Sequence, residues 1–181
     1  LEDENSAFVF GGVTGSSIYA LSVERAAYKQ ALFPGSMNLT LKSTTNPNGL
    51  SLTDDSKMVN VPTYYGTMRA YQVISGSDGK SYNSGSGAGS NGYTSVSGSY
   101  GLFLPDIGTI LLNGDALDLS TAQGLNLGTE EGTNIDGQNP LKLLTALQSG
   151  SNFSLNSEET ITSDFVFVRA RNSEFNYSEN P

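Results

Sequence analysis

The clearest alternation of apolar and polar positions lies close to the C-terminal end of the sequence, over residues 164–171. Side chains there repeat with the two-residue period of a β-strand. One face carries Phe165, Phe167, Arg169 and Arg171, and the other carries Val166, Val168 and Ala170. Both faces are apolar in the first half, which is typical of a strand covered on both sides. Burial of the two phenylalanines would contribute roughly 1.5–3 kcal/mol each. The pattern therefore predicts a central strand of the core.

Shorter segments with the same period predict a series of further strands. They are residues 7–10, 18–23, 37–41, 50–52, 70–74, 100–104 and 109–113. The turn sequences T-T-N-P-N-G and P-D-I-G are expected to join two pairs of them into hairpins over 36–53 and 100–113. Residues 59–65 contain Pro62, so we expect an edge strand or irregular chain there.

Two segments carry helical rather than strand patterns. Residues 24–33 are rich in helix formers and end at the breaker pair Pro34-Gly35, so a short helix is predicted over about 25–33. The second short helix is expected over about 140–149, with Leu141, Leu144 and Leu147 as its apolar stripe. At about three turns it is too short to be stable alone, and it must dock on a sheet.

Glycine and serine dominate residues 76–99, where the chain offers almost no apolar side chain to bury. Such a segment is predicted to be a flexible loop, or to be ordered by neighbouring subunits. Together these patterns predict a mainly β (β-rich α+β) fold of antiparallel sheets, sandwich-like, with one or two short helices and long Gly/Ser-rich loops. We expect residues 1–181 to form a single β-rich domain.

Composition narrows the possible functions. The chain has 9 basic and 18 acidic residues, a net charge of −9, so nucleic acid and anionic membranes are not expected partners. It contains neither cysteine nor histidine. Because serine and cysteine nucleophiles usually depend on those residues, their absence excludes the common forms of nucleophilic catalysis. We therefore expect no enzymatic activity, no small-molecule substrate, no metal and no cofactor.

Carboxylate pairs leave one catalytic alternative open. The pairs are Asp54/Asp55, Asp115/Asp118, Glu130/Glu131 and Glu158/Glu159. A glycosidase of this kind would need two carboxylates about 5 to 10 Å apart across a cleft, whereas adjacent acids in polar segments are usually solvated. Asp78-Gly79 and the Asp115–Asp118 segment could supply calcium ligands, but no D-x-D-x-D-G loop occurs. Turns and helix caps are the favoured explanation of these acids.

Arginine and tyrosine residues are the candidates for subunit contacts. Arg169 and Arg171 could form bidentate pairs with carboxylates of a neighbouring subunit, or they could cap the sheet within their own chain. Both interpretations remain open. The tyrosines in polar segments that suit a hydrated interface are Tyr64, Tyr65, Tyr82, Tyr93 and Tyr177.

Four segments resemble parts of large virion structural proteins of contractile-tailed, myovirus-type phages, especially those of marine cyanophages. They are S-E-E-T-I-T-S-D-F-V-F-V-R-A-R-N-S-E-F-N-Y-S-E-N-P (157–181), I-Y-A-L-S-V-E-R-A-A-Y-K-Q (18–30) with its F-P-G-S-M-N-L-T-L continuation, S-G-S-Y-G-L-F-L-P-D-I-G-T-I-L-L-N (97–113) and N-P-L-K-L-L-T-A-L (139–147). The resemblance implies a non-enzymatic virion component of the tail, baseplate or neck, assembled in the host cytoplasm. Its partners would be copies of itself and other virion proteins.

The same resemblance implies that this chain is a segment of a longer structural protein, because the proteins it resembles continue past the N-Y-S-x-N-P stretch. An alternative function comes from a different class. A secreted or surface glycan-binding β-sandwich module, such as an adhesin or receptor-binding domain, would use exposed aromatic side chains and Asp/Asn-rich loops as its sugar platform. A monomer that binds oligosaccharide without assembling would favour that alternative.

Overall fold

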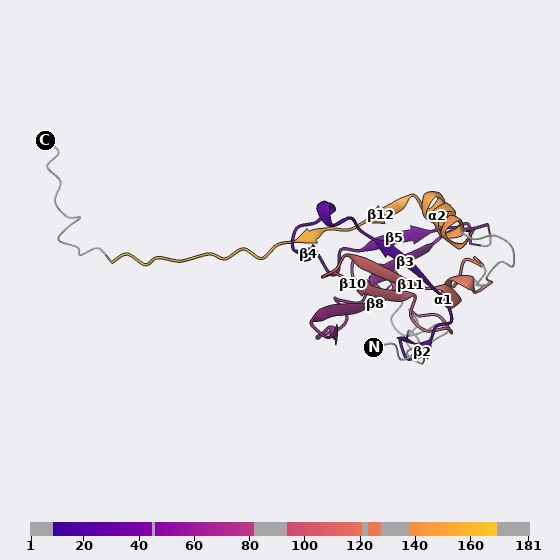
Figure 1. Cartoon of the computed structure of the whole chain (residues 1–181), viewed down its shortest axis with the longest axis horizontal. Helices are drawn as coiled ribbons and strands as arrows, with labels where there is room; N and C mark the ends of the chain where they lie inside the picture. The colour runs from indigo at the N-terminus through magenta and orange to yellow at the C-terminus, as the bar shows by residue number, and fades with distance from the viewer. Residues whose placement is uncertain (1–8, 45, 82–93, 121–122, 128–137, 170–181) are drawn as a thin grey trace, which may run out of the picture.

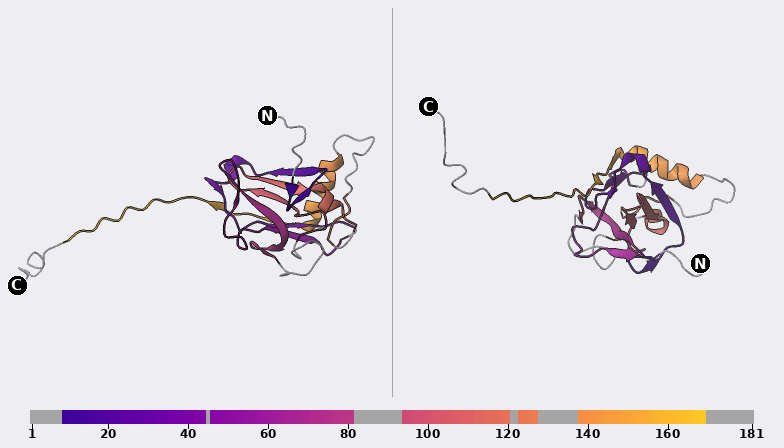
Figure 2. Two further views of the ribbon diagram at one scale, coloured as in Figure 1. Left: turned by 90° about the horizontal axis from the view of Figure 1, so that it is seen from below. Right: turned by 60° about the vertical axis from the view of Figure 1, so that its left-hand side comes forward.

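The computed structural model describes residues 9–44, 46–81, 94–120, 123–127 and 138–169. Its main feature is a sheet in which the strands follow the order β12-β5-β6-β8-β10-β11-β3, with β7 and β9 paired to β8. All of the pairings are antiparallel. The sheet curls into a half-barrel (Figures 1 and 2). The predicted mainly β class with antiparallel sheets is confirmed, and one curled sheet encloses the core.

The bounds of the strands in this sheet follow. They are β3 (Ile18–Ser22), β5 (Asn38–Leu41), β6 (Leu50–Asp54), β7 (Thr63–Tyr65), β8 (Met68–Ser77), β9 (Lys80–Ser81), β10 (Gly101–Leu104), β11 (Thr109–Asn113) and β12 (Asn152–Ser154). Two small sheets pair β1 (Val9–Phe10) with β2 (Val13–Thr14), and β4 (Ala31–Leu32) with β13 (Ser157–Glu158). The predicted hairpins over 36–53 and 100–113 are confirmed as β5-β6 and β10-β11.

Side chains on the inner face of the sheet form rows that cross several strands. Leu21, Ile110, Phe103 and Tyr71 are successive partners from β3 to β8. Phe103 and Ile110 are fully buried, and Leu21 packs against the same core from the edge of the sheet. These rows exist because alternation places every second residue inward in register with its neighbour. The inner face of β3 thus closes one side of the core.

The turn between β10 and β11 depends on glycine. Gly108 has a φ of +67°, which side chains rarely adopt, and an added Cβ would lie 2.6 Å from the Tyr28 hydroxyl. The carbonyl of Gly108 also accepts a hydrogen bond from the Val23 amide. The predicted turn therefore closes the β10-β11 hairpin and also holds the end of β3.

Two short helices flank the sheet. Helix α1 (Gly114–Asp118) begins at the Asn113 side chain, which accepts hydrogen bonds from the amides of Asp115 and Ala116. Helix α2 (Gln138–Gly150) contacts β5, so the helix predicted over 140–149 is confirmed. Its predicted stripe is only partly correct. The buried residues are Leu143 and Ala146, whereas Leu141 and Leu144 are about half exposed.

The helix predicted over 25–33 is wrong. Only a 3-10 turn, η1 (Arg25–Ala27), forms there, and β4 follows it. The Leu32 amide donates to the Pro105 carbonyl, and the Phe33 amide to the Asn156 carbonyl. Because distant segments take these backbone hydrogen bonds, the helix-forming composition is overridden by tertiary pairing.

The expected 76–99 loop is ordered at both ends. Gly76 and Ser77 belong to β8 and Lys80 and Ser81 to β9, and Ser95 and Ser99 are buried. The Asn113 side chain donates hydrogen bonds to the carbonyls of Ser97 and Ser99. Residues 82–93 lie outside the described residues.

The central strand predicted over 164–171 is also wrong for the described part of that segment. Residues 159–169 run in extended conformation away from the body, and no described strand pairs with them (Figures 1 and 2). Phe165 is 82% exposed and Phe167 is 96% exposed. The alternating pattern predicts burial within the chain, but other strands fill the core. Residues 170 and 171 lie outside the described residues.

Candidate functional site

The C-terminal arm, defined here as residues 161–169, leaves the body at a firmly held root. Strand β13 pairs with β4, and the Thr160 amide donates a hydrogen bond of 2.9 Å to the Gln30 side chain. Glu159 forms an ion pair with Lys29 on the surface. These contacts hold the chain up to Thr160. Beyond this residue the arm makes no hydrogen bond to the rest of the described chain.

Arg69 on β8 ties the root to the sheet. Its guanidinium donates to Asp106, at 3.0 and 2.6 Å, and to Glu158 of β13. The hydrogen bond to Asp106, with the added one to Glu158, raises the pKa of Arg69 above its ordinary value. Partial burial opposes ionisation of Asp106, but the hydrogen bonds from Arg69 outweigh it and lower the pKa of that carboxyl. Sequence analysis missed this cluster, although a charged residue inside an apolar strand is a signal for an ion pair.

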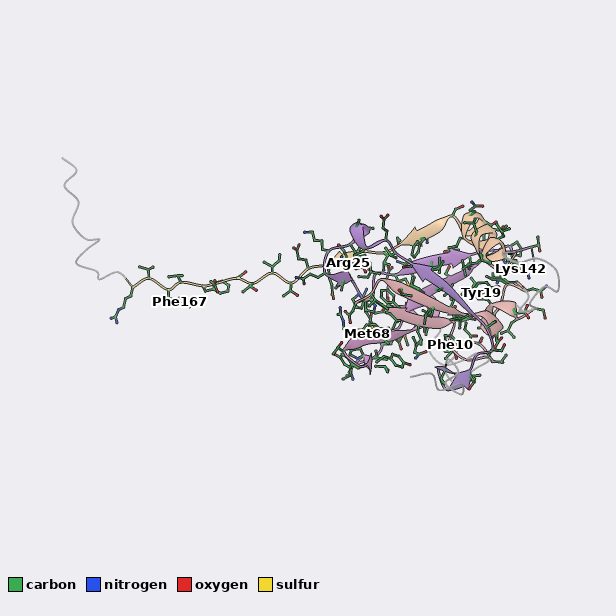
Figure 3. All side chains as sticks on the ribbon, in the orientation of Figure 1. Phe10, Tyr19, Arg25, Met68, Lys142 and Phe167 are labelled. Carbon is green, nitrogen blue, oxygen red and sulfur yellow. The ribbon has the colours of Figure 1, made fainter. Side chains whose placement is uncertain are left out.

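Every large apolar side chain of the arm is exposed. The exposed fractions are 80% for Ile161, 82% for Phe165, 84% for Val166, 96% for Phe167 and 85% for Val168. Figure 3 shows Phe167 on the extended segment, well outside the body of the protein. An exposed apolar segment of this kind is a candidate surface for contact with another molecule. Its strand-like conformation allows both faces to be covered at once.

The predicted interface residues fall in separate places. Arg169 is exposed at the end of the arm, so it does not cap the sheet within the described part of its own chain. Tyr64 and Tyr65 lie on β7, with exposed fractions of 56% and 46%. Their roles in an interface stay predictions. The remaining predicted positions, Arg171, Tyr82, Tyr93 and Tyr177, lie outside the described residues.

The Asp54/Asp55 pair is buried and bound to backbone amides. Both carboxylate oxygens of Asp54 accept from the Gly35 amide at 2.9 Å, and one also accepts from Ser56 at 3.1 Å. Asp55 accepts from the Gln72 amide at 3.0 Å. Burial, opposed by that hydrogen bond and reinforced by the charge of Asp54, raises the pKa of Asp55 to about 6. The two acids hold loops and strands together.

The other acids predicted as catalytic or metal-binding candidates also have structural contacts. Asp115 accepts from the backbone and hydroxyl of Ser16, and Asp78 accepts from the Asn38 amide group at 2.8 Å. Glu158 and Glu159 are in the ion pairs of the root. Within the described ranges, no group of three or more potential metal-ligating side chains is found. Glu130 and Glu131 lie outside those ranges.

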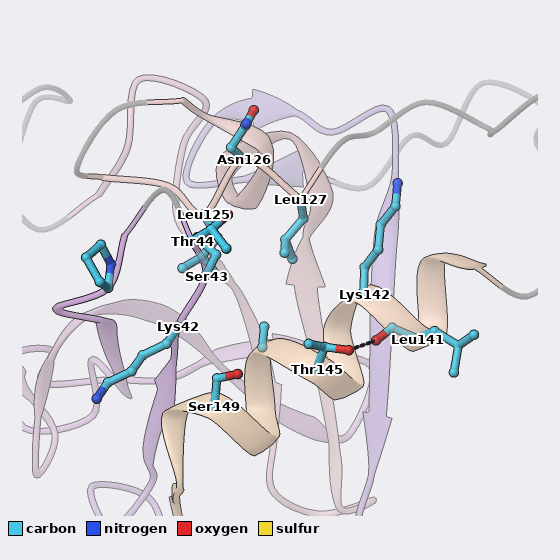
Figure 4. Close-up of a pocket in the computed structure, with 12 residues that line it drawn as sticks. Lys42, Ser43, Thr44, Leu125, Asn126, Leu127, Leu141, Lys142, Thr145 and Ser149 are labelled. Atoms are coloured by element: carbon cyan, nitrogen blue, oxygen red, sulfur yellow. Dashed lines mark hydrogen bonds between the residues drawn. The ribbon is translucent and has the colours of Figure 1, made fainter.

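A pocket of about 600 Å³ lies beside α2, as Figure 4 shows. Lys42 and Lys142 contribute its charge, and the Thr145 hydroxyl is occupied by a hydrogen bond to the Leu141 carbonyl. The two lysine side chains point away from each other in Figure 4, so they do not converge on one ligand. Among the described residues that line it, none carries a carboxylate.

A second, smaller hollow lies between the edge strand β3 and helix α2. This groove of about 360 Å³ is lined by Ile18–Leu21 of β3 and by Pro140, Leu143, Leu144 and Leu147 of α2. The side chains of the lining are apolar apart from the Tyr19 hydroxyl. Strand β3 pairs with β11 along one edge, and no described strand pairs with its other edge. The groove thus combines an apolar surface with an open strand edge.

Comparison of the chain with protein-family models, with curated proteins and with solved structures finds no match. Among the helices of the described residues, none is long and apolar enough to span a membrane. A proposal about the function therefore has to be argued from the geometry of the arm, the groove and the acids.

Proposed function

We propose that this chain is a non-enzymatic structural component of a tailed-phage virion, in the tail, baseplate or neck, that joins neighbouring subunits through its C-terminal arm. The observation that carries the proposal is the exposure of every large apolar side chain of the arm beyond a firmly bound root. The partners are copies of the chain and other virion proteins, and the location is the virion after assembly in the host cytoplasm.

The energetics of the arm favour a role in assembly. Burying one phenylalanine side chain stabilises a contact by roughly 1.5–3 kcal/mol, and Phe165 and Phe167 are both exposed in the single chain. An extended segment also offers its backbone amides and carbonyls to the edge of a neighbouring sheet. In a symmetric assembly each such contact is repeated by every copy. A modest contact per subunit then stabilises the whole particle.

The contacts of the carboxylates support a non-enzymatic role. Asp54 and Asp55 accept hydrogen bonds from backbone amides in the interior, and Glu158 and Glu159 form ion pairs at the root of the arm. Such acids act as structural links, because a catalytic carboxylate has to face a substrate in a cleft. The resemblance of four segments to virion structural proteins agrees with this role.

The proposal is tested by sedimentation velocity on three forms of the chain: residues 1–181, a form ending at Thr160, and an Arg169→Ala/Arg171→Ala variant. We expect concentration-dependent assembly of the full chain, its loss in the truncated form and its weakening in the double variant. Thermal unfolding of the monomer should be unchanged in all three, since the arm buries nothing in its own chain. A full chain that stays monomeric at every concentration would contradict the proposal.

One observation favours the glycan-binding alternative, namely the exposure of both Tyr64 and Tyr65 on β7. Successive residues of a strand point to opposite faces, so the two rings do not form one stacking platform. Oligosaccharide binding by the monomer that is lost in Tyr64→Ala or Tyr65→Ala would establish the alternative. If the form ending at Thr160 still bound oligosaccharide, glycan binding would be shown to be independent of assembly through the arm.

A further inference from the structure

The edge of the sheet at β3 is suited to accept another strand. Its inner-face residues Tyr19 and Leu21 end two rows of paired inner-face positions that cross the sheet from β8. Between them and α2 lies the apolar groove described above, in which Leu144 is still 46% exposed. Because an unpaired edge presents free amide and carbonyl groups, a further strand could continue both the hydrogen bonding and the rows.

The C-terminal arm has the side-chain pattern that this edge requires. Placed antiparallel to β3 with Phe165 opposite Leu21, the arm also brings Phe167 opposite Tyr19. The two phenylalanines would then extend the inner-face rows into the groove, toward Leu143 of α2. Antiparallel pairing is also the arrangement of all the described strand pairs.

The outer face matches in the same register. Val168 would lie opposite Ile18, which pairs two apolar side chains. Asp164 would lie opposite Ser22, which pairs two polar side chains. A parallel arrangement with the same phenylalanines facing inward would instead place Asp164 opposite Ile18. The antiparallel register is therefore favoured by both faces of the arm.

Charge is complementary at the end of the groove. In this register Arg169 lies opposite Ser17, next to the first turn of helix α1. Asp115 accepts hydrogen bonds from Ser16 there, and Asp118 is close enough to Tyr19 to add to the effect of burial in raising the pKa of that tyrosine. A guanidinium placed between two carboxylates is a strong anchor for a strand.

We propose that the C-terminal arm of one copy adds as an antiparallel strand to the free edge of β3 in a second copy, with Phe165 and Phe167 filling the groove beside α2. This inference rests on the proposed function and names the surface that receives the arm. The second copy is the occupant because Lys29, Gln30 and Arg69 hold the root so that the arm runs away from its own β3 (Figures 1 and 2).

The test uses disulfide cross-linking, since the chain has no cysteine of its own. Four single variants are made at exposed outer-face positions: Ile18→Cys, Ser22→Cys, Asp164→Cys and Val168→Cys. Pairs of variants are mixed, oxidised and separated by non-reducing electrophoresis. The unmixed variants control for cross-links between identical positions.

We expect covalent dimers from the mixtures of Ile18→Cys with Val168→Cys and of Ser22→Cys with Asp164→Cys. The yield of covalent dimer should be at least about tenfold lower in the exchanged mixtures, which are Ile18→Cys with Asp164→Cys and Ser22→Cys with Val168→Cys. In addition, Phe167→Ser should raise the dissociation constant of the assembly by about tenfold or more, the loss expected for a central apolar anchor.

Four results would overturn the inference. Preference for the exchanged mixtures would mean a parallel arrangement. A doubly substituted Ile18→Cys/Val168→Cys chain that closes only as a monomer would show that the arm binds its own β3. Assembly that needs the arm but yields no cross-link to β3 would refute this acceptor surface while leaving the proposed function standing, whereas a monomer with or without the arm would refute both.

Discussion

Neighbouring acids on β6 and its following turn should respond in opposite ways to the same substitution. Asp54 is fully buried, and its two oxygens accept a bidentate hydrogen bond from the Gly35 amide. Asp55 is 9% exposed and accepts a hydrogen bond from the Gln72 amide. Replacing each in turn by asparagine removes the charge and leaves one acceptor oxygen. We expect Asp54→Asn to destabilise the fold and Asp55→Asn to stabilise it at neutral pH.

The magnitude for Asp55 follows from its pKa. Burial raises that pKa from 3.8 to about 6, so the folded chain binds the proton more tightly than the unfolded chain. The stability that this group contributes is therefore present below pH 4 and is lost as the pH rises through 6. Moving the pKa from 3.8 to about 6 costs about 3 kcal/mol of unfolding free energy above pH 7. Asparagine at this position keeps an acceptor oxygen for the Gln72 amide and should recover about 1–3 kcal/mol of this lost unfolding free energy.

The magnitude for Asp54 follows from its hydrogen bonds. The asparagine amide group would place two donors where the Gly35 amide now finds a second acceptor, in a site without access to water. Loss of one buried hydrogen bond and the unsatisfied donors together cost about 1–3 kcal/mol.

Urea denaturation from pH 4 to pH 8, at matched protein concentrations, measures both effects. The difference between Asp55→Asn and the unmodified chain should be near zero at pH 4 and grow as the pH rises to about 7. Because the two curves share every other titrating group, their difference isolates Asp55. Equal destabilisation by the two asparagine variants at pH 7.5, or a difference for Asp55→Asn that does not change with pH, would refute the reasoning.

Two further predictions concern the root of the arm and the arm itself. Arg69→Met should lower the free energy of unfolding by about 1–3 kcal/mol, since it removes charge-assisted hydrogen bonds to Asp106 and Glu158. Lys29→Met, which removes a more exposed ion pair, should cost less than about 1 kcal/mol; equal losses in urea denaturation would contradict this account. Phe167→Ser should change monomer stability by less than about 0.5 kcal/mol, whereas Phe103→Ala should cost about 3–5 kcal/mol. A large calorimetric effect of Phe167→Ser on the monomer would place the arm in the core.

Local patterns in the sequence were sufficient to predict several elements. The β5-β6 and β10-β11 hairpins were found because alternation and turn residues lie next to each other in the chain. Helix α2 was found from its apolar residues and its final glycine, although the choice of buried face was not, since that depends on where β5 lies. The Asp54/Asp55 pair is visible in the sequence as two adjacent acids, but its burial could not be predicted from the sequence.

The sequence by itself determined that the chain is rich in antiparallel strands, lacks histidine and cysteine, and carries an alternating apolar segment near its C-terminus. Only the tertiary structure decided which strand-like segments are paired. Residues 38–41 and 164–168 both have patterns typical of a strand, yet Leu39 is buried and Phe167 is exposed. A two-residue period specifies that a segment has two faces, but not which partner covers them. That choice depends on long-range pairing, here of β4 with β13 and of Arg69 with Glu158, which fixes the arm outside the core of its own chain.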